Sequence, residues 1–129
     1  MIVLDASTVV ELLANSPAHE RIAAWIGKSA PLQAPHLLDI EVISALRRHC
    51  ALGSMTDQRA QLALNQFRLL PITRHSHLPH MERIWELRHN FTAYDAMYLA
   101  LAEALDTVLL TQDAALASAR LRRGRVELL

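Results

Sequence analysis

The fold of this chain is decided by the stretch Thr92-Ala-Tyr-Asp-Ala-Met-Tyr-Leu-Ala-Leu-Ala-Glu-Ala-Leu-Asp-Thr-Val-Leu-Leu-Thr-Gln-Asp113. Its first part predicts a helix over residues 92–105, because Thr92 and Asp95 form a capping pattern ahead of a long apolar run. Its second part predicts a short apolar strand, Val108–Thr111, which ends just before Asp113. A helix that leads into such a strand is typical of an α/β fold.

The rest of the chain repeats this alternation. Further strands are expected at residues 1–4, 32–34, 71–73 and 126–129. Further helices are expected at residues 8–15 (capped by Ser7), 17–27, 37–52 (closed by Gly53), 56–70 (capped by Thr56), 77–89 and 113–120. Strands separated by helices or helix pairs are expected to be parallel, with right-handed crossovers. The sequence therefore predicts a single α/β domain over residues 1–129.

The composition predicts a globular domain without a membrane-spanning helix. The 129 residues are 52% hydrophobic and 20% charged, which is enough apolar material for one core. No apolar stretch reaches the roughly 18 residues of a spanning helix, and no basic segment precedes an apolar run as in a signal peptide. The single cysteine, Cys50, excludes an internal disulfide and fits a reducing, cytoplasmic location.

Four acidic residues lie at the ends of predicted elements. Asp5 and Asp113 follow strands, whereas Glu41 and Asp95 lie near the starts of helices. Crossover helices run antiparallel to parallel strands, so their N-termini lie at the carboxyl edge of the sheet. All four carboxylates are therefore expected at that one edge, where open α/β sheets bind their ligands.

Converging carboxylates repel one another unless a cation neutralises them, so this edge predicts a site for a divalent metal. Mg²⁺ prefers hard oxygen ligands, and four carboxylates could hold one ion or two. Such a metal lowers the pKa of a bound water and offsets the charge of an attacked phosphate. Ser7 and Thr111 offer hydroxyl groups beside Asp5 and Asp113, in accessory positions.

The charge balance permits a nucleic-acid substrate without requiring one. The chain has 13 basic and 13 acidic residues, so without the four candidate ligands the remainder is 13 − 9 = +4. All basic residues except Lys28 are arginines. The planar guanidinium group matches phosphate, which suits a phosphodiester substrate. A bias toward arginine codons explains the same count equally well.

Several motifs have competing interpretations. Asp95 and Asp113 could serve only as helix caps. The histidines of His75-x-His77-x-x-His80 have metal-ligand character, but Pro79 interrupts them. The basic segment 120–125 could bind phosphates or simply end a helix in solvent. A receiver-type phosphoacceptor domain would need a lysine near its acids, and Lys28 is predicted far from them.

The acidic signatures resemble those of PIN-domain nucleases. The resemblance rests on Asp5-Ala-Ser7, Glu41, the helix from Tyr94-Asp-Ala to Ala102, and Thr111-x-Asp113, and the size is similar to VapC toxins of VapBC toxin–antitoxin modules. It implies a PIN fold with strand order 3-2-1-4-5 and a Mg²⁺- or Mn²⁺-dependent endoribonuclease whose metal site holds the four acids.

The resemblance further implies a homodimer and inhibition by a VapB-type antitoxin whose C-terminal segment covers the acidic pocket. RNA would then be cleaved by metal-activated water. An RNA-processing nuclease without a toxin role, and a non-catalytic PIN-like binding module, remain alternatives.

Overall fold

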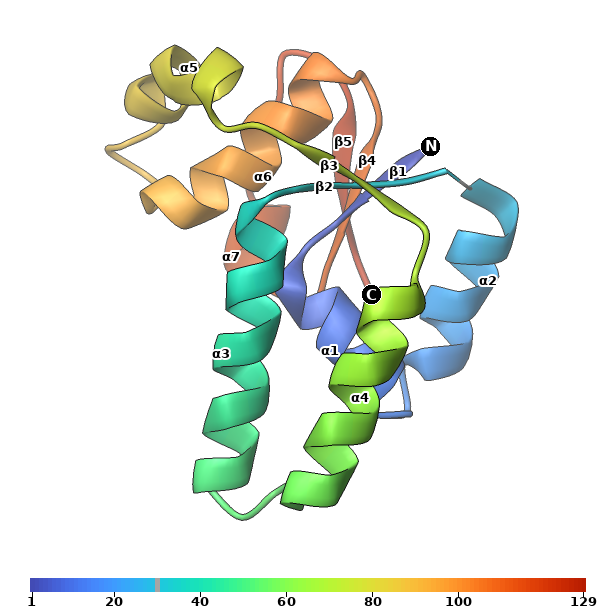
Figure 1. The fold of residues 1–129 in the computed structure, drawn as a ribbon. Helices are drawn as coiled ribbons and strands as arrows, with labels where there is room; N and C mark the ends of the chain where they lie inside the picture. The colour runs from blue at the N-terminus through green and yellow to red at the C-terminus, as the bar shows by residue number, and fades with distance from the viewer. Residues whose placement is uncertain (30) are drawn as a thin grey trace.

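A computed structural model describes residues 1–29 and 31–129. Along the chain the elements are β1 (Ile2–Leu4), α1 (Ala6–Leu13), α2 (His19–Ser29), β2 (Leu32–Pro35), α3 (Leu37–Ala51), α4 (Asp57–Leu69), β3 (Ile72–His75), the 3₁₀ helix η1 (Leu78–His80), α5 (Met81–Glu86), α6 (Ala93–Ala104), β4 (Val108–Thr111), α7 (Ala114–Ala117) and β5 (Arg125–Leu128) (Figure 1). The expected α/β fold is confirmed.

Within the described residues, five strands form one sheet in the order β3-β2-β1-β4-β5. Every neighbouring pair is parallel, and Val3 of β1 lies between Gln33 of β2 and Leu109 of β4. The strand order reverses between β1 and β4, because β1 continues to β2 on one side while β4 lies on the other. Ligands of open α/β sheets bind at such a switch point. Asp5 and Asp113 follow the two strands that meet there.

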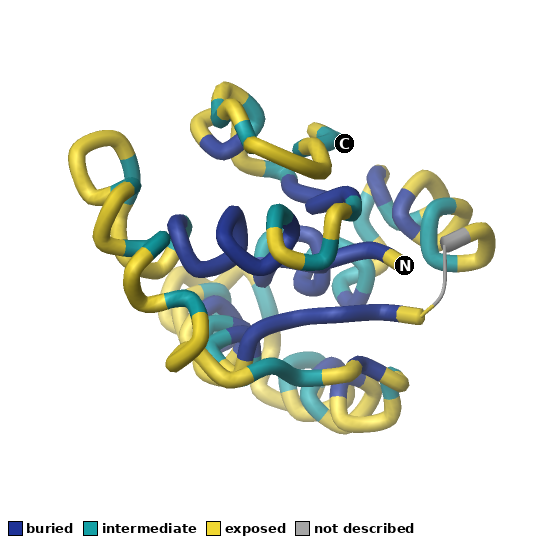
Figure 2. Tube along the Cα trace, turned by 90° about the horizontal axis from the view of Figure 1, so that it is seen from above, coloured by how far each residue is buried: buried dark blue, intermediate teal, exposed yellow. Residues whose placement is uncertain are grey.

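The core lies between the central strands and the helices that pack on them. Strand β1 is fully buried, and α6 packs against β1, β2 and β4. The segment 96–102 of α6 is buried without interruption. Figure 2 shows these buried stretches at the centre of the molecule, with exposed segments around them. This rigid core fixes the strand ends and the start of α6, where the acidic residues lie.

The helices α3 and α4 run antiparallel and contact each other (Figure 1). Gly53 closes α3 with φ +74°, a conformation that favours glycine, and Thr56 caps α4 by accepting a hydrogen bond from the Arg59 N–H at 3.1 Å. Both features were predicted from the sequence. No helix in the described part of the chain is both long and apolar enough to cross a membrane.

Three local predictions were wrong. The cap of α1 is Asp5 and not Ser7, because the Asp5 carboxylate accepts the Thr8 N–H at 2.9 Å. The expected helix 77–89 is instead the 3₁₀ turn η1, which contains Pro79, followed by α5, which ends at Glu86. The expected helix 113–120 is only the short α7, whose cap is Asp113.

Candidate functional site

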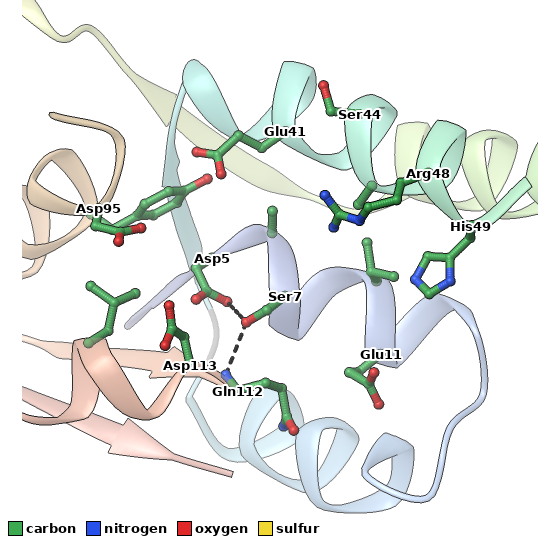
Figure 3. Close-up of a pocket in the computed structure, with 15 residues that line it drawn as sticks. Asp5, Ser7, Glu11, Glu41, Ser44, Arg48, His49, Asp95, Gln112 and Asp113 are labelled. Carbon is green, nitrogen blue, oxygen red and sulfur yellow. Dashed lines mark hydrogen bonds between the residues drawn. The ribbon is translucent and has the colours of Figure 1, made fainter. Parts of the chain in front are cut away.

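A pocket of about 380 Å³ opens at the carboxyl edge of the sheet (Figure 3). It is lined by Asp5, Ala6, Ser7, Val10, Glu11, Glu41, Ser44, Ala45, Arg48, His49, Asp95, Tyr98, Gln112, Asp113 and Leu116. All four acids that the sequence singled out line this one pocket, although they come from segments far apart in the chain. The structure therefore places the four acids around one pocket at this edge.

Each acid is positioned by a different element. Asp5 follows β1 and Asp113 follows β4, so the two lie on neighbouring strands. Asp95 lies in the first turn of α6, where its backbone N–H donates to the Thr92 hydroxyl at 3.1 Å. Glu41 lies in the second turn of α3, which begins at Leu37 as predicted. The pocket is therefore assembled by the sheet and by two helix starts.

Asp5 is the most constrained of the four acids, with only 4% of its surface exposed. Its Oδ1 atom accepts hydrogen bonds from the Ser7 hydroxyl at 2.8 Å and from the Thr8 N–H at 2.9 Å. Its Oδ2 atom accepts from the Thr111 hydroxyl at 2.5 Å. The same carboxylate thus caps α1 and faces the pocket, with its orientation set by three donors.

The two accessory hydroxyls tie the ends of β1 and β4 together. Ser7 donates to Asp5 and accepts the Gln112 N–H at 3.0 Å, as the dashed lines of Figure 3 mark. Thr111 does not line the pocket; it donates to Asp5 and accepts the Asp113 N–H at 2.9 Å. Both residues therefore hold acids in place.

Replacing Thr111 with Val should lower the free energy of unfolding by about 1–3 kcal/mol, because a buried Asp5 oxygen would lose its donor. Urea denaturation of the metal-free protein measures this loss. Thr111→Ser keeps the hydroxyl and serves as the control, so it should lose clearly less stability. Equal losses in the two variants would show that the hydrogen bond to Asp5 contributes little.

The electrostatic environment disfavours ionised carboxylates. Burial raises the pKa of the Asp5 carboxyl, although its hydrogen bonds oppose the change. Burial is also the main cause of the raised pKa of Glu41 and of Asp95. The neighbouring charges of Asp95 and Asp5 raise the pKa of Glu41 further, and those of Asp113 and Asp5 raise the pKa of Asp95. The acids are thus close enough to repel one another, and a cation would relieve that repulsion.

Three buried polar atoms of the residues that line this pocket lack hydrogen-bond partners, and one of them is Nε2 of Gln112. The other two are Oε1 of Glu41 and the hydroxyl of Tyr98, a residue whose surface is only 1% exposed. The two groups lie near each other, and the hydroxyl favours the ionised carboxylate, but no well-formed hydrogen bond joins them. Burial raises the pKa of the Tyr98 phenol, and the charge of Glu41 raises it further, so it remains a neutral donor. Such unpartnered atoms are available to bind a water or an ion.

The donor set fits a hard divalent cation such as Mg²⁺, which prefers carboxylate and water oxygens. The free Oε1 atom of Glu41 is a ready ligand. Within residues 1–29 and 31–129, no three His, Cys, Asp or Glu side chains are yet gathered into a metal-binding group. The four carboxylates therefore line one pocket without forming such a group in the described residues.

Sequence reasoning missed several pocket residues as site residues. Tyr98 follows Asp95 by one turn of α6, and this spacing of three residues could have placed both on one face. Arg48 follows Glu41 by two turns of α3, a spacing that also places both on one face of the helix. Glu11, His49 and Gln112 carry no distinguishing pattern, because their positions depend on how α1, α3 and β4 meet.

The competing motifs do not form sites in the described residues. His75 contacts the Gln33 side chain and His77 accepts the Leu37 N–H, and no metal-binding group includes them. Lys28 lies in the last turn of α2, outside the acidic pocket, so a receiver-type site is not supported. Asp39, in the first turn of α3, pairs with Arg74 at 2.8 Å and lies outside the acidic pocket.

The basic segment 120–125 takes part in ion pairs. Arg122 donates to the Glu86 carboxylate at 3.0 Å and contributes its backbone N–H to Glu103. Among the aromatic residues, Phe67 is buried, and Trp85 is 67% exposed on α5. Neither feature adds a second catalytic centre.

The sequence matches the PIN domain family over residues 2–121. It is 44% identical over 118 residues to Ribonuclease VapC1 of Mycobacterium tuberculosis strain H37Rv, which covers 91% of this chain and 89% of that relative. It is 35% identical over 128 residues to Ribonuclease VapC12 of the same strain, with 99% and 98% covered.

Two crystal structures share the fold. PAE2754 from Pyrobaculum aerophilum has a TM-score of 0.73 at 26% identity, covering 97% of this chain and 82% of that one. Mycobacterium tuberculosis VapC20, titled a sarcin-ricin loop cleaving toxin, has a TM-score of 0.65 at 18% identity, with 95% and 99% covered. The latter likeness shows the fold alone.

Proposed function

The chain belongs to the PIN domain family, and on that premise we propose that it is a VapC-type, Mg²⁺-dependent endoribonuclease, the toxin of a type II toxin–antitoxin pair. The observation that carries the proposal is the convergence of Asp5, Glu41, Asp95 and Asp113 in one pocket at the switch point. Relatives at 35–44% identity over nearly the whole chain are named VapC ribonucleases, which supports the same activity here.

In this proposal the four acids bind Mg²⁺, with Mn²⁺ as a possible substitute. When bound, the ion makes a water nucleophilic at neutral pH and offsets charge on the attacked phosphate. Asp5 is oriented by Ser7, Thr8 and Thr111, so it contributes a fixed ligand. Glu41 contributes a carboxylate oxygen that has no other partner. The neutral Tyr98 phenol can donate a hydrogen bond toward Glu41 or toward the substrate.

The test is incubation of the purified protein with labelled single-stranded RNA, in Mg²⁺ and in excess chelator. Single-stranded or looped RNA is the suitable substrate, because its bases are accessible to side chains. Cleavage is expected only with the metal. RNA that stays intact with both Mg²⁺ and Mn²⁺ would contradict the nuclease proposal, and cleavage that persists in chelator would contradict the metal.

We also propose that a VapB-type antitoxin inhibits the protein by covering the acidic pocket with its C-terminal segment. The names of the relatives support this partner, and the single, unpaired Cys50 supports a cytoplasmic setting for the pair. A neighbouring open reading frame should encode a small DNA-binding protein that co-purifies with this chain and blocks cleavage. A neighbouring protein that neither binds nor inhibits would argue for an RNA-processing nuclease instead.

A homodimer is proposed on the basis of an exposed apolar face on η1 and α5. Leu78, Met81 and Trp85 are 74%, 59% and 67% exposed, and their spacing of three and four residues places them on one face. A second copy of the chain is the proposed occupant, because exposed anchors of this kind are typical of interfaces.

Replacing Trp85 with Glu should raise the dimer dissociation constant by about tenfold or more, since a buried aromatic anchor would become a charge. Sedimentation velocity over a range of concentrations measures the change. Leu69→Glu on α4, where the leucine is 83% exposed, is the matched control and should leave association unchanged. A native protein that sediments as a monomer throughout would rule out the dimer.

A further inference from the structure

Arg48 lies on the same face of α3 as Glu41, two turns further along the helix. Ser44 and Ala45 lie between them and also line the pocket, as expected for residues that share a helix face. Seven residues of α-helix separate the two positions by about 10 Å along the axis. Figure 3 shows the Arg48 guanidinium group pointing into the pocket beyond the four acids. The four acids therefore lie at one end of the pocket, called the acidic end below, and the positively charged Arg48 lines its wall further along α3.

The charge of Arg48 is not balanced by an ion pair within the described residues. In the described part of the chain Arg48 forms no ion pair, whereas Arg74, Arg83 and Arg122 each bind a carboxylate. Glu11 lines the same pocket without pairing with Arg48. The guanidinium group is thus exposed, charged and available to an anion.

Arg48 also does not neutralise the acidic cluster. The pKa values of Asp5, Glu41 and Asp95 are all raised, by burial and, for Glu41 and Asp95, also by neighbouring carboxylates, and no cation contributes to lowering them. An acidic pocket by itself repels a polyanion such as RNA. A cation within the same pocket, set apart from the acids, would offset that repulsion where the strand passes.

Building on the ribonuclease function proposed above, we propose that Arg48 binds a phosphate of the RNA strand next to the phosphate that is cleaved. The planar fork of a guanidinium group matches phosphate oxygens. Contacts to backbone phosphates set the register of a nucleic acid without reading its sequence. Arg48 thereby holds the strand across the pocket, so that one phosphodiester lies at the acidic end.

The competing explanation is that Arg48 merely complements the C-terminal end of α3, where cations are favourable. Arg47 shares the last turns of that helix and the same exposure, but it faces the groove between α3 and α4 and not the acidic pocket. Arg47→Gln therefore removes the same charge from the same helix end. Any difference in RNA cleavage or binding between the two variants therefore arises from the position of Arg48 in the pocket.

The test compares native protein, Arg48→Gln and Arg47→Gln in steady-state cleavage of labelled single-stranded RNA with Mg²⁺. Arg48→Gln should raise KM roughly tenfold, as expected for loss of a charged hydrogen bond, and leave kcat nearly unchanged. Arg47→Gln should match the native protein. Arg48→Lys should restore part of the loss, because a point charge still attracts phosphate.

Binding provides a second readout that does not depend on turnover. In an Asp95→Asn background, fluorescence anisotropy with the same RNA should show weaker binding for Arg48→Gln only. The slope of log K against log salt should fall by about one, as for one lost phosphate contact. Melting temperatures confirm that each variant is folded.

The outcomes separate this inference from the function on which it rests. If the native protein cleaves RNA and Arg48→Gln behaves like Arg47→Gln, the role of Arg48 is overturned and the ribonuclease function stands. A fall in kcat with unchanged KM and unchanged salt slope would also overturn it. If the native protein neither cleaves nor binds RNA, both proposals fail together.

Discussion

Replacing Asp95 with Asn should lower the rate of RNA cleavage by about a hundredfold or more, since a proposed metal-ligand carboxylate is lost. The change keeps the size and shape of the side chain, and Asp95 is only partly buried, so the fold should persist. The backbone hydrogen bond from residue 95 to Thr92 is unaffected. Cleavage of labelled RNA in Mg²⁺, with circular dichroism of both proteins, measures the effect.

The matched control is Asp57→Asn. Asp57 is also an acid in the first turn of a helix that a threonine caps, but it lies outside the acidic pocket. Both variants lose a favourable interaction with the helix dipole, so only the pocket distinguishes them. Equal cleavage rates in the two variants would remove Asp95 from the site and leave the acidic cluster without a catalytic role.

Magnesium should stabilise the native protein strongly and the Asp95→Asn variant far less. A ligand at about 100 times its dissociation constant contributes about 2.7 kcal/mol, which corresponds to roughly 10 °C in the melting temperature of a domain of this size. In chelator the order should reverse, and the variant should melt above the native protein. The reason is repulsion, because Asp113 and Asp5 both raise the pKa of Asp95.

Differential scanning fluorimetry measures the melting temperatures in magnesium and in chelator. The ionic strength is kept constant, because salt alone screens the repulsion between the carboxylates. Asp57→Asn should respond to magnesium as the native protein does. A native melting temperature that is the same in magnesium and in chelator would argue against a metal site. It would leave a non-catalytic PIN-like module as the better description.

Much of the fold followed from local patterns. The apolar strand before Asp5, the capped helix that begins at Thr92 and the Gly53 stop of α3 were predicted because each depends on neighbours in sequence. The segment 77–89 was predicted as one helix because its apolar residues keep helical spacing, whereas the structure divides it into η1 and α5. The cap of α1 was assigned to Ser7 and belongs to Asp5, since two polar residues near one helix start compete for the same N–H groups.

The four acids could be predicted as a cluster for a topological reason. Parallel strands with helical crossovers bring strand ends and helix starts to one edge, whatever their separation in the chain. That expectation required only the order of elements and the positions of Asp5, Glu41, Asp95 and Asp113. The resemblance to PIN nucleases rested on the same residues.

What the sequence determined by itself is the identity of the acids and the edge at which they meet, because periodicity and chain order carry that information. Only the tertiary structure decided how each acid is held and what else faces it. The bond from Thr111 to Asp5 joins residues 106 positions apart, and the unpartnered Glu41 oxygen and the free Arg48 depend on how α3 packs against α1 and β2. Hydrogen-bond partners and neighbouring charges depend on distances between residues that are far apart in the chain. Local sequence patterns do not predict those distances.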